Sequence, residues 1–196
     1  MAEVTVEQIK KLKELSGAGL TDAKKALVEA KGDFDKALEA MRKKGLTKAE
    51  KRGDRETREG LIEAYIHDGR LGAIVEVNCE TSFVAKTDEF KTLAHQIAMQ
   101  IASMNPLYVS EADIPEADRK AKIKELEANF KGPENMKETI LEGQVKKAFS
   151  DKVLMNQPYI LDDTKTVEQF IKEAIAKTGE NITIRQFKRI ELGVTE

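Results

Sequence analysis

Few side chains in this sequence could carry out covalent or acid–base chemistry. The chain holds two histidines, His67 and His95, and one cysteine, Cys79. A zinc site needs several such ligands at a recognisable spacing, and no CxxC pair is present. Asp and Glu are abundant, but no pair is isolated by apolar neighbours as an acid–base pair requires. The sequence gives no reason to predict an enzyme, and we expect His95 to be an ordinary surface or core histidine.

A glycine-rich turn contains some ingredients of a phosphate-binding loop. Residues 17–25, GAGLTDAKK, combine glycines, an expected helix N-terminus and two lysines. The segment matches neither GxGxxG nor GxxxxGK[ST], and it follows a helix where both motifs follow a strand. Asp22 would also repel a phosphate. We therefore interpret the turn as a corner between helices that presents Leu20 and Lys24.

The segment VEVNCETSFVAK, residues 75–86, poses a sharper question. An alternating strand pattern gives way to small polar residues, and Thr81 or Ser82 can cap a following helix. Phe83 and Phe90 lie seven residues apart, on nearly the same face of a continuous helix. Spacing alone therefore favours Phe83 as the first core residue of that helix. The alternative is a side chain held out for a partner.

Length and composition limit the classes of protein to which this chain can belong. The 196 residues allow one sizeable core and a small satellite domain, and the net charge is only -2. No apolar run reaches the roughly 20 residues of a membrane span. The N-terminal MAEVTVEQIKK has no apolar signal core. A single cysteine excludes an intramolecular disulfide and fits a reducing cytoplasm, with pairing of Cys79 between two copies as the alternative.

Charge is distributed unevenly along the chain. Residues 1–53 hold 13 Lys and Arg against 9 Asp and Glu. This excess is typical of solvated helix faces, and it also motivates an alternative function as an RNA- or ribosome-associated module. Aromatic residues make up only 5% of the chain, and no stacking motif interleaves with the lysines. The composition therefore argues against direct nucleic-acid binding.

Residues 1–45 are predicted to form a module of three short helices, separated by turn-rich breaks. Thr21 or Asp22 can cap the second helix and Asp33 the third, and we expect Gly45 to close the module. The expected apolar stripes contain Ile9, Leu12, Leu15, Ala23, Ala26, Leu27, Ala30, Phe34, Leu38 and Met41. Residues 46–59 are almost wholly polar and are predicted to be a charged connector with little to bury.

Residues 60–196 are predicted to form an α+β core. Strand-like runs over 61–67 and 71–79 flank Asp68-Gly69, a strong hairpin signal. A long helix is expected from Ser82 to Met104. The other expected elements are helices over 110–130 and 134–150, a helix containing Val167, Phe170, Ile171 and Ile175, and a strand over 181–192. This order predicts a small antiparallel three-stranded sheet packed against helices.

Several long segments of this chain resemble one family, elongation factor Ts, the guanine-nucleotide exchange factor of elongation factor Tu. The resemblance runs over nearly the whole chain, in the family's order. The segments are IKKLKELSGAGLTDAKKALVEAKGDFDKALEAMRKKG, EGLIEAYIHDGRLGAIVEVNCETSFVAK, HQIAMQIASMNPLYV, NQPYILDD and GENITIRQFKRIELG. It implies a binding protein without cofactor or covalent chemistry of its own. It also implies that the first module is similar to a ubiquitin-associated domain and docks on the partner's nucleotide-binding domain through Leu12, Leu20 and Lys24.

The resemblance also assigns a role to the segment after the second strand. The family's Thr-Asp-Phe-Val motif corresponds to Thr81, Ser82, Phe83 and Val84. In the family the phenylalanine wedges into the partner's nucleotide domain, disturbs the magnesium and phosphate sites, and loosens GDP. The resemblance thus reverses the preference that spacing alone gives for Phe83.

This sequence departs from the family pattern at a few positions. Ser82 replaces the usual Asp, which keeps a helix cap but removes a charge. Leu20-Thr21 replaces Met-Met, Ala23 stands where many members have Cys, and Gln100 stands where the family often has His. We therefore expect exchange that is weaker or tuned to a particular partner.

The chain resembles the compact members of the family, with one core unit where longer members carry two. This implies a homodimer whose two copies rebuild the larger surface and form a heterotetramer with two molecules of elongation factor Tu. A cytoplasmic location without membrane attachment is expected.

Overall fold

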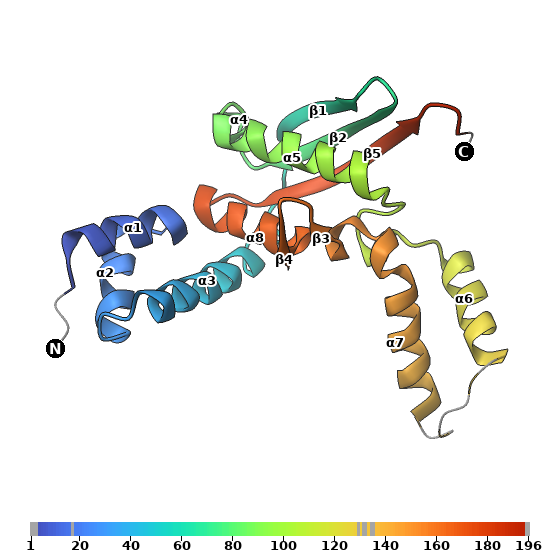
Figure 1. Cartoon of the computed structure of the whole chain (residues 1–196), viewed down its shortest axis with the longest axis horizontal. Helices are drawn as coiled ribbons and strands as arrows, with labels where there is room; N and C mark the ends of the chain where they lie inside the picture. Colours follow the sequence, from blue (N-terminus) through green and yellow to red (C-terminus); the bar gives the residue numbers. More distant parts are fainter. Residues whose placement is uncertain (1–3, 17, 129, 131–132, 134–135, 195–196) are drawn as a thin grey trace. The chain divides into compact units, whose positions relative to one another are not determined.

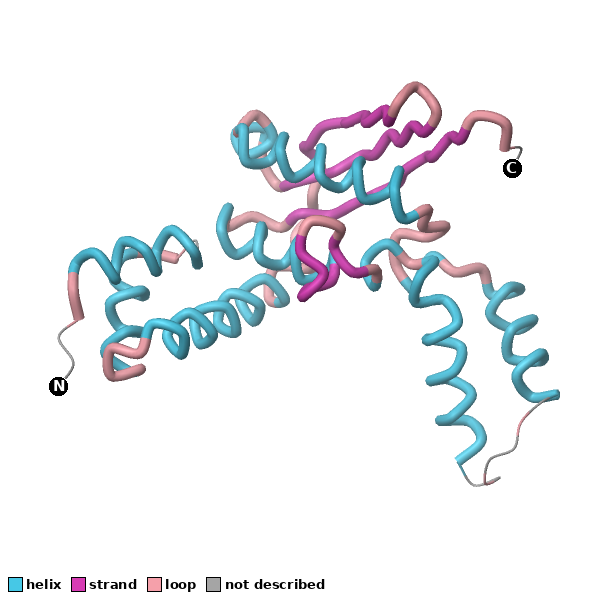
Figure 2. Tube along the Cα trace, in the orientation of Figure 1, coloured by secondary structure: helices cyan, strands magenta, loops and turns pink. Residues whose placement is uncertain are grey.

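A computed structural model describes residues 4–16, 18–128, 130, 133 and 136–194 (Figures 1 and 2). The chain divides into two compact units. The first comprises Met1–Glu63, Glu76–His95 and Gln169–Ile184, and the second comprises Ala64–Val75, Gln96–Glu168 and Arg185–Glu196. The strands of the main sheet and helix α5 run through both units, so neither unit is a simple segment of sequence.

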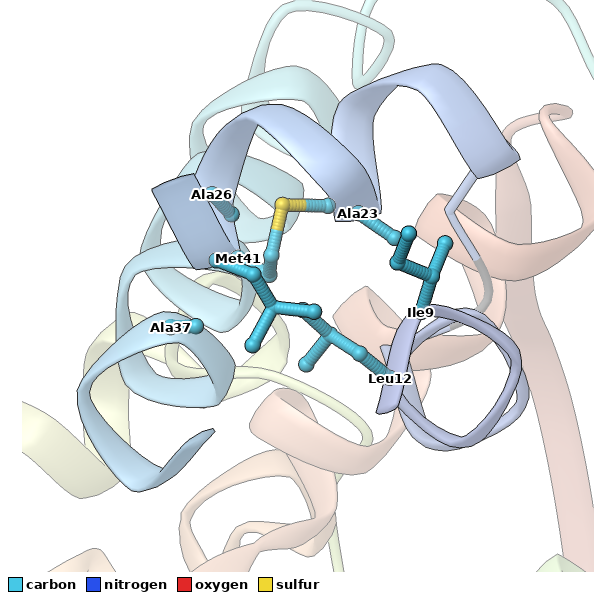
Figure 3. Close-up of a cluster of buried hydrophobic side chains, with 7 residues drawn as sticks. Ile9, Leu12, Ala23, Ala26, Ala37 and Met41 are labelled. Atoms are coloured by element: carbon cyan, nitrogen blue, oxygen red, sulfur yellow. The ribbon is translucent and has the colours of Figure 1, made fainter. Parts of the chain in front are cut away.

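Three helices form the N-terminal module, as the sequence predicts. They are α1 (Val6–Ser16), α2 (Leu20–Glu29) and α3 (Phe34–Glu50). Figure 3 shows side chains from all three helices pointing toward one another. The buried cluster consists of Ile9, Leu12, Ala23, Ala26, Leu27, Ala37 and Met41. The small alanines on α2 and α3 allow the helices to approach closely, so a short module still buries a continuous apolar core.

The helix ends of the module follow the sequence prediction only in part. The predicted cap of α2 at Thr21 or Asp22 is wrong, because the backbone is extended at Gly19 and the helix already begins at the next residue. Asp22 instead accepts a hydrogen bond from Lys44 Nζ at 3.2 Å. The predicted cap of α3 is confirmed, since Asp33 Oδ1 accepts from Lys36 N at 3.1 Å.

Helix α3 does not end at Gly45, as we expected, but continues to Glu50. A Cβ atom at Gly45 would lie 3.2 Å from Ala176 Cβ on α8 (Val167–Thr178), so this glycine permits a close helix contact. Within the same unit, Glu50 pairs with Lys172 of α8 at 3.5 Å. The connector is therefore partly helical and packed. The domain limits 1–45, 46–59 and 60–196 stay a prediction.

The core contains the predicted antiparallel three-stranded sheet, in the order β1-β2-β5. Strands β1 (Glu59–His67) and β2 (Leu71–Cys79) form a hairpin, and β5 is Ile182–Glu191. The hairpin turn has positive φ at Asp68 (48°) and Gly69 (67°), the conformation that Asp-Gly favours. The predicted strands and turn are confirmed.

The remaining elements lie mostly in the second unit. Helix α5 (Asp88–Met104) contacts β5, where Arg189 Nε donates to the carbonyl of Ala102 at 3.0 Å. Helices α6 (Glu116–Ala128) and α7 (Lys137–Phe149) lie side by side, as Figure 1 shows. Short 3₁₀ helices occur at Glu111–Asp113, Ser150–Lys152 and Leu154–Asn156, and a second sheet pairs β3 (Pro158–Tyr159) with β4 (Asp162–Thr166). The second sheet was not predicted, because its strands are short and lack apolar alternation.

Candidate partner-binding site

The segment after β2 forms a single helical turn, α4 (Ser82–Ala85), that is separate from α5. Our prediction of one continuous helix from Ser82 to Met104 is therefore wrong. Thr81 caps α4, since its Oγ1 accepts from Val84 N at 3.4 Å. Thr87 plays the same part for α5, since its Oγ1 accepts from Phe90 N at 3.2 Å. Each of these caps begins a helix, so α4 and α5 are two separate helices.

The break decides the position of Phe83. Its side chain is 80% exposed, whereas Phe90 is 1% exposed in the core. The interpretation of Phe83 as the first core residue of a long helix is therefore wrong. Large aromatic side chains are enriched at protein–protein interfaces, and an exposed one on a short anchored turn suits contact with a partner.

The other three residues of the motif have different surroundings. Thr81 and Ser82 are exposed beside Phe83. Val84 is only 7% exposed, and the next residue, Ala85, is also buried. The assignment of Val84 as a partner contact is therefore not supported by its position. Its buried side chain holds the turn against the core of the protein.

A carboxylate from a distant segment holds the start of this turn. Glu180 follows α8, and its Oε2 accepts from Thr81 N at 3.0 Å. Its Oε1 accepts from Thr81 Oγ1 at 2.6 Å. Sequence reasoning missed Glu180, because it lies far from the turn along the chain and carries no local signal of this contact.

The neighbouring Asn181 holds the end of the connector. Its backbone N–H donates to Glu80 Oε1 at 2.6 Å, immediately before the capping threonine. Its side-chain Nδ2 donates to the carbonyls of Gly53 at 3.2 Å and Arg55 at 2.8 Å. Asn181 itself is buried, whereas Gly53 and Arg55, whose carbonyls it contacts, are exposed. Glu180 and Asn181 together therefore hold both the connector and the turn that carries Phe83.

Replacing Asn181 with alanine should lower the free energy of unfolding by about 1–3 kcal/mol, because both side-chain hydrogen bonds to the connector are lost. Urea denaturation followed by circular dichroism measures this loss. An unchanged midpoint would show that water replaces the amide without cost.

The residues assigned to the N-terminal docking surface separate into two groups. Leu12 has no exposed surface and lies in the core of the module, so its assignment as a partner contact is wrong. Leu20 is 51% exposed, and Lys24 is exposed one helical turn later. Residues four apart share a helix face, so Leu20 and Lys24 present an apolar and a cationic group together.

Gln100 is fully buried in the second unit. Its Nε2 donates to Gln157 Oε1 at 3.2 Å and to the carbonyl of Pro158 at 3.1 Å. Its Oε1 accepts from the backbone of Ile160 at 2.9 Å. The side chain therefore fixes the segment that leads into β3 and is not presented to a partner.

The remaining chemistry-bearing residues have structural surroundings. His95 lies on the surface, with Nδ1 2.9 Å from Glu63 Oε1, as expected of an ordinary histidine. Cys79 is fully buried, and burial raises the pKa of its thiol. A thiol in this position is a poor nucleophile and is not available to a second copy.

The described residues hold neither a metal site nor a membrane-spanning helix. Within residues 4–16, 18–128, 130, 133 and 136–194, no three His, Cys, Asp or Glu side chains converge to hold a metal ion. Over the same part of the chain, no helix is long and apolar enough to cross a membrane. The exposed turn and the Leu20 corner are therefore the features that sequence and structure single out together.

Comparisons with known proteins agree on one family. The family model described as "Elongation factor TS" matches residues 2–194. The chain is 53% identical over 194 residues to the protein named Elongation factor Ts of Thermotoga maritima, covering 97% of each chain. It is 50% identical over 199 residues to the protein of the same name from Rippkaea orientalis, covering 98% of this chain and 80% of the relative. The chain belongs to the elongation factor Ts family.

Proposed function

We propose that this protein is a guanine-nucleotide exchange factor that binds elongation factor Tu in its GDP form and promotes release of GDP. The observation that carries the proposal is Phe83, an exposed aromatic side chain on a turn anchored on both sides. Leu20 and Lys24 provide a second exposed corner for docking. The activity requires binding alone, with no cofactor and no covalent chemistry. An exchange factor for translation acts where translation takes place, so we place the protein in the cytoplasm.

The proposed mechanism is disturbance of the partner's magnesium site. Mg²⁺ bound to a nucleotide neutralises phosphate charge and links the phosphates to the protein. A wedge such as Phe83 that displaces this ion removes a major contact of GDP, so GDP dissociates faster. By linkage, GDP must weaken binding of the factor to the same extent. The factor therefore accelerates exchange in both directions, and a higher concentration of GTP drives it forward.

Release of fluorescent GDP from elongation factor Tu, with and without this protein, tests the proposal directly. We expect the release rate to rise with the concentration of the factor and to reach a plateau. The absence of any acceleration at saturating concentration would overturn the exchange function.

We propose further that two copies associate through the outer face of the main sheet. Side chains alternate along a strand, so Ile74 points away from the face on which Ala73 and Val75 are buried. Ile66 on β1 and Ile190 on β5 are exposed on the flanking strands. Monomeric proteins rarely leave such apolar groups together in water, and a second copy would cover them. Two partner molecules would then bind one dimer.

Replacing Ile74 with lysine should weaken this dimer at least about tenfold, because a buried charge without a partner opposes association. Size-exclusion chromatography with light scattering, over a dilution series, measures the change. Val28→Lys is the matched control, because Val28 is also an exposed apolar residue but lies on α2. A monomeric unmodified protein, or equal effects of the two substitutions, would contradict the proposed interface.

A further inference from the structure

The segment Gly179-Glu180-Asn181 holds the turn that carries Phe83, but the function proposed above assigns it no part in binding. Gly179 has a positive φ of 81° and ends α8, which turns the chain back toward the start of β5. Thr178 Oγ1 accepts from the backbone of Glu180 at 3.4 Å and donates to the carbonyl of Ala174 at 2.9 Å. The backbone at Glu180 is therefore fixed by the end of α8, so its side chain starts from a defined position.

Both oxygens of the Glu180 carboxylate accept hydrogen bonds from the same residue, Thr81. One oxygen accepts the backbone N–H of Thr81 and the other accepts its hydroxyl, at 3.0 and 2.6 Å. Hydrogen bonds to an ionised carboxylate are shorter and stronger than those between neutral groups. The two-point contact fixes both the backbone and the side-chain rotamer of Thr81.

Thr81 is the residue on which the geometry of α4 depends. Its Oγ1 accepts from Val84 N while it donates to Glu180, so one hydroxyl links the carboxylate to the helical turn. A helix of four residues has little stability of its own, because a single turn fixes many dihedral angles for few hydrogen bonds. The turn therefore depends on anchors at its two ends, which are Glu180 through Thr81 and the buried Val84.

We propose that Glu180 is a positioning residue that orders the Phe83 turn before the partner binds. This inference rests on the proposed function, because it assigns to Glu180 a part in presenting Phe83. A turn that is ordered in the free protein loses less conformational entropy on binding, so the complex forms at a lower concentration. Glu180 itself need not touch the partner.

The test measures the GDP release rate over a range of factor concentrations for Glu180→Ala and for the unmodified protein. We expect the concentration that gives half of the maximal rate to rise about tenfold, the cost of ordering about one residue. The maximal rate should stay within about twofold, because Phe83 is still present once the complex has formed. Hydrogen–deuterium exchange of the free protein should become faster over residues 81–84. Glu138→Ala, an exposed glutamate on α7, is the matched control.

A conservative pair of variants separates positioning from a general effect on folding. Glu180→Gln keeps one acceptor oxygen and should have a smaller effect than Glu180→Ala, whereas Thr81→Val loses the hydroxyl and should follow Glu180→Ala. If Glu180→Ala folds poorly, Thr81→Val carries the same test with the carboxylate left in place. A change that only lowered the folded fraction would also raise the half-maximal concentration, so the folded fraction of each variant is measured by circular dichroism. Such a change would speed hydrogen–deuterium exchange throughout the protein and would not confine the faster exchange to residues 81–84.

The outcomes distinguish this inference from the function on which it rests. If the unmodified protein accelerates GDP release and Glu180→Ala does so at the same concentrations, the positioning role is overturned and the exchange function stands. If the unmodified protein does not accelerate release at all, the exchange function fails, and the positioning role fails with it. A raised half-maximal concentration with faster local exchange at residues 81–84 supports both.

Discussion

Replacing Phe83 with alanine should slow release of GDP from elongation factor Tu by about 30-fold or more at a fixed concentration of the factor. The central aromatic residue of an interface commonly contributes about 2 kcal/mol or more, which corresponds to this factor. Because the side chain is 80% exposed, its removal leaves no cavity in the free protein. We therefore expect the free energy of unfolding to change by less than about 0.5 kcal/mol.

Stopped-flow fluorescence of labelled GDP and thermal unfolding measure the two quantities on the same preparation. Leu161→Ala is a suitable control, because it also removes an exposed apolar side chain, from the loop between β3 and β4. An unchanged release rate would remove Phe83 from the mechanism. A fall of several degrees in the midpoint of thermal unfolding would instead indicate that Phe83 is a core residue.

The sequence contained the information needed to place Phe83, although its spacing from Phe90 pointed the other way. A seven-residue spacing puts two side chains on one face only if the helix between them is continuous. Thr87 is followed by Asp88 and Glu89, an N-cap with an acidic first turn, which is a signal for a new helix. The N-caps at Thr81 and Thr87 begin two separate helices, so the seven-residue spacing does not put Phe83 and Phe90 on one helix face. Chain-wide resemblance pointed to an exposed Phe83, as the structure has it.

Other features were predictable because they depend on local sequence. The hairpin follows from Asp68-Gly69 between two alternating runs, and the cap of α3 follows from Asp33. The contact of Glu180 with Thr81 joins residues 99 apart, and no local pattern encodes it. The burial of Leu12, by contrast, follows from its place in the apolar stripe of the first helix, which the resemblance overrode when it assigned Leu12 to the docking surface. A resemblance can assign a residue to a docking surface, but packing decides whether its side chain reaches that surface.

Replacing Phe90 with alanine should have the opposite pattern of effects from the same substitution at Phe83. Phe90 lies on α5 with 1% of its side chain exposed, so its removal leaves a cavity in the core. Substitutions of this kind cost about 3–5 kcal/mol, a large part of the stability of an ordinary domain. Chemical denaturation should show this loss, and Phe90→Leu should recover part of it by refilling the site.

Exchange activity separates the two phenylalanines. At a temperature where the Phe90→Ala variant is still folded, its GDP release rate per folded molecule should equal that of the unmodified protein, because Phe83 and its anchors at Thr81 and Val84 are intact. A loss of activity as large as that of Phe83→Ala, without unfolding, would show that α5 transmits its packing to the turn. If the release rates of Phe90→Ala and the unmodified protein are equal, Phe83 belongs to the interface and Phe90 to the core. The boundary between the two then lies at Thr87, where α4 gives way to α5.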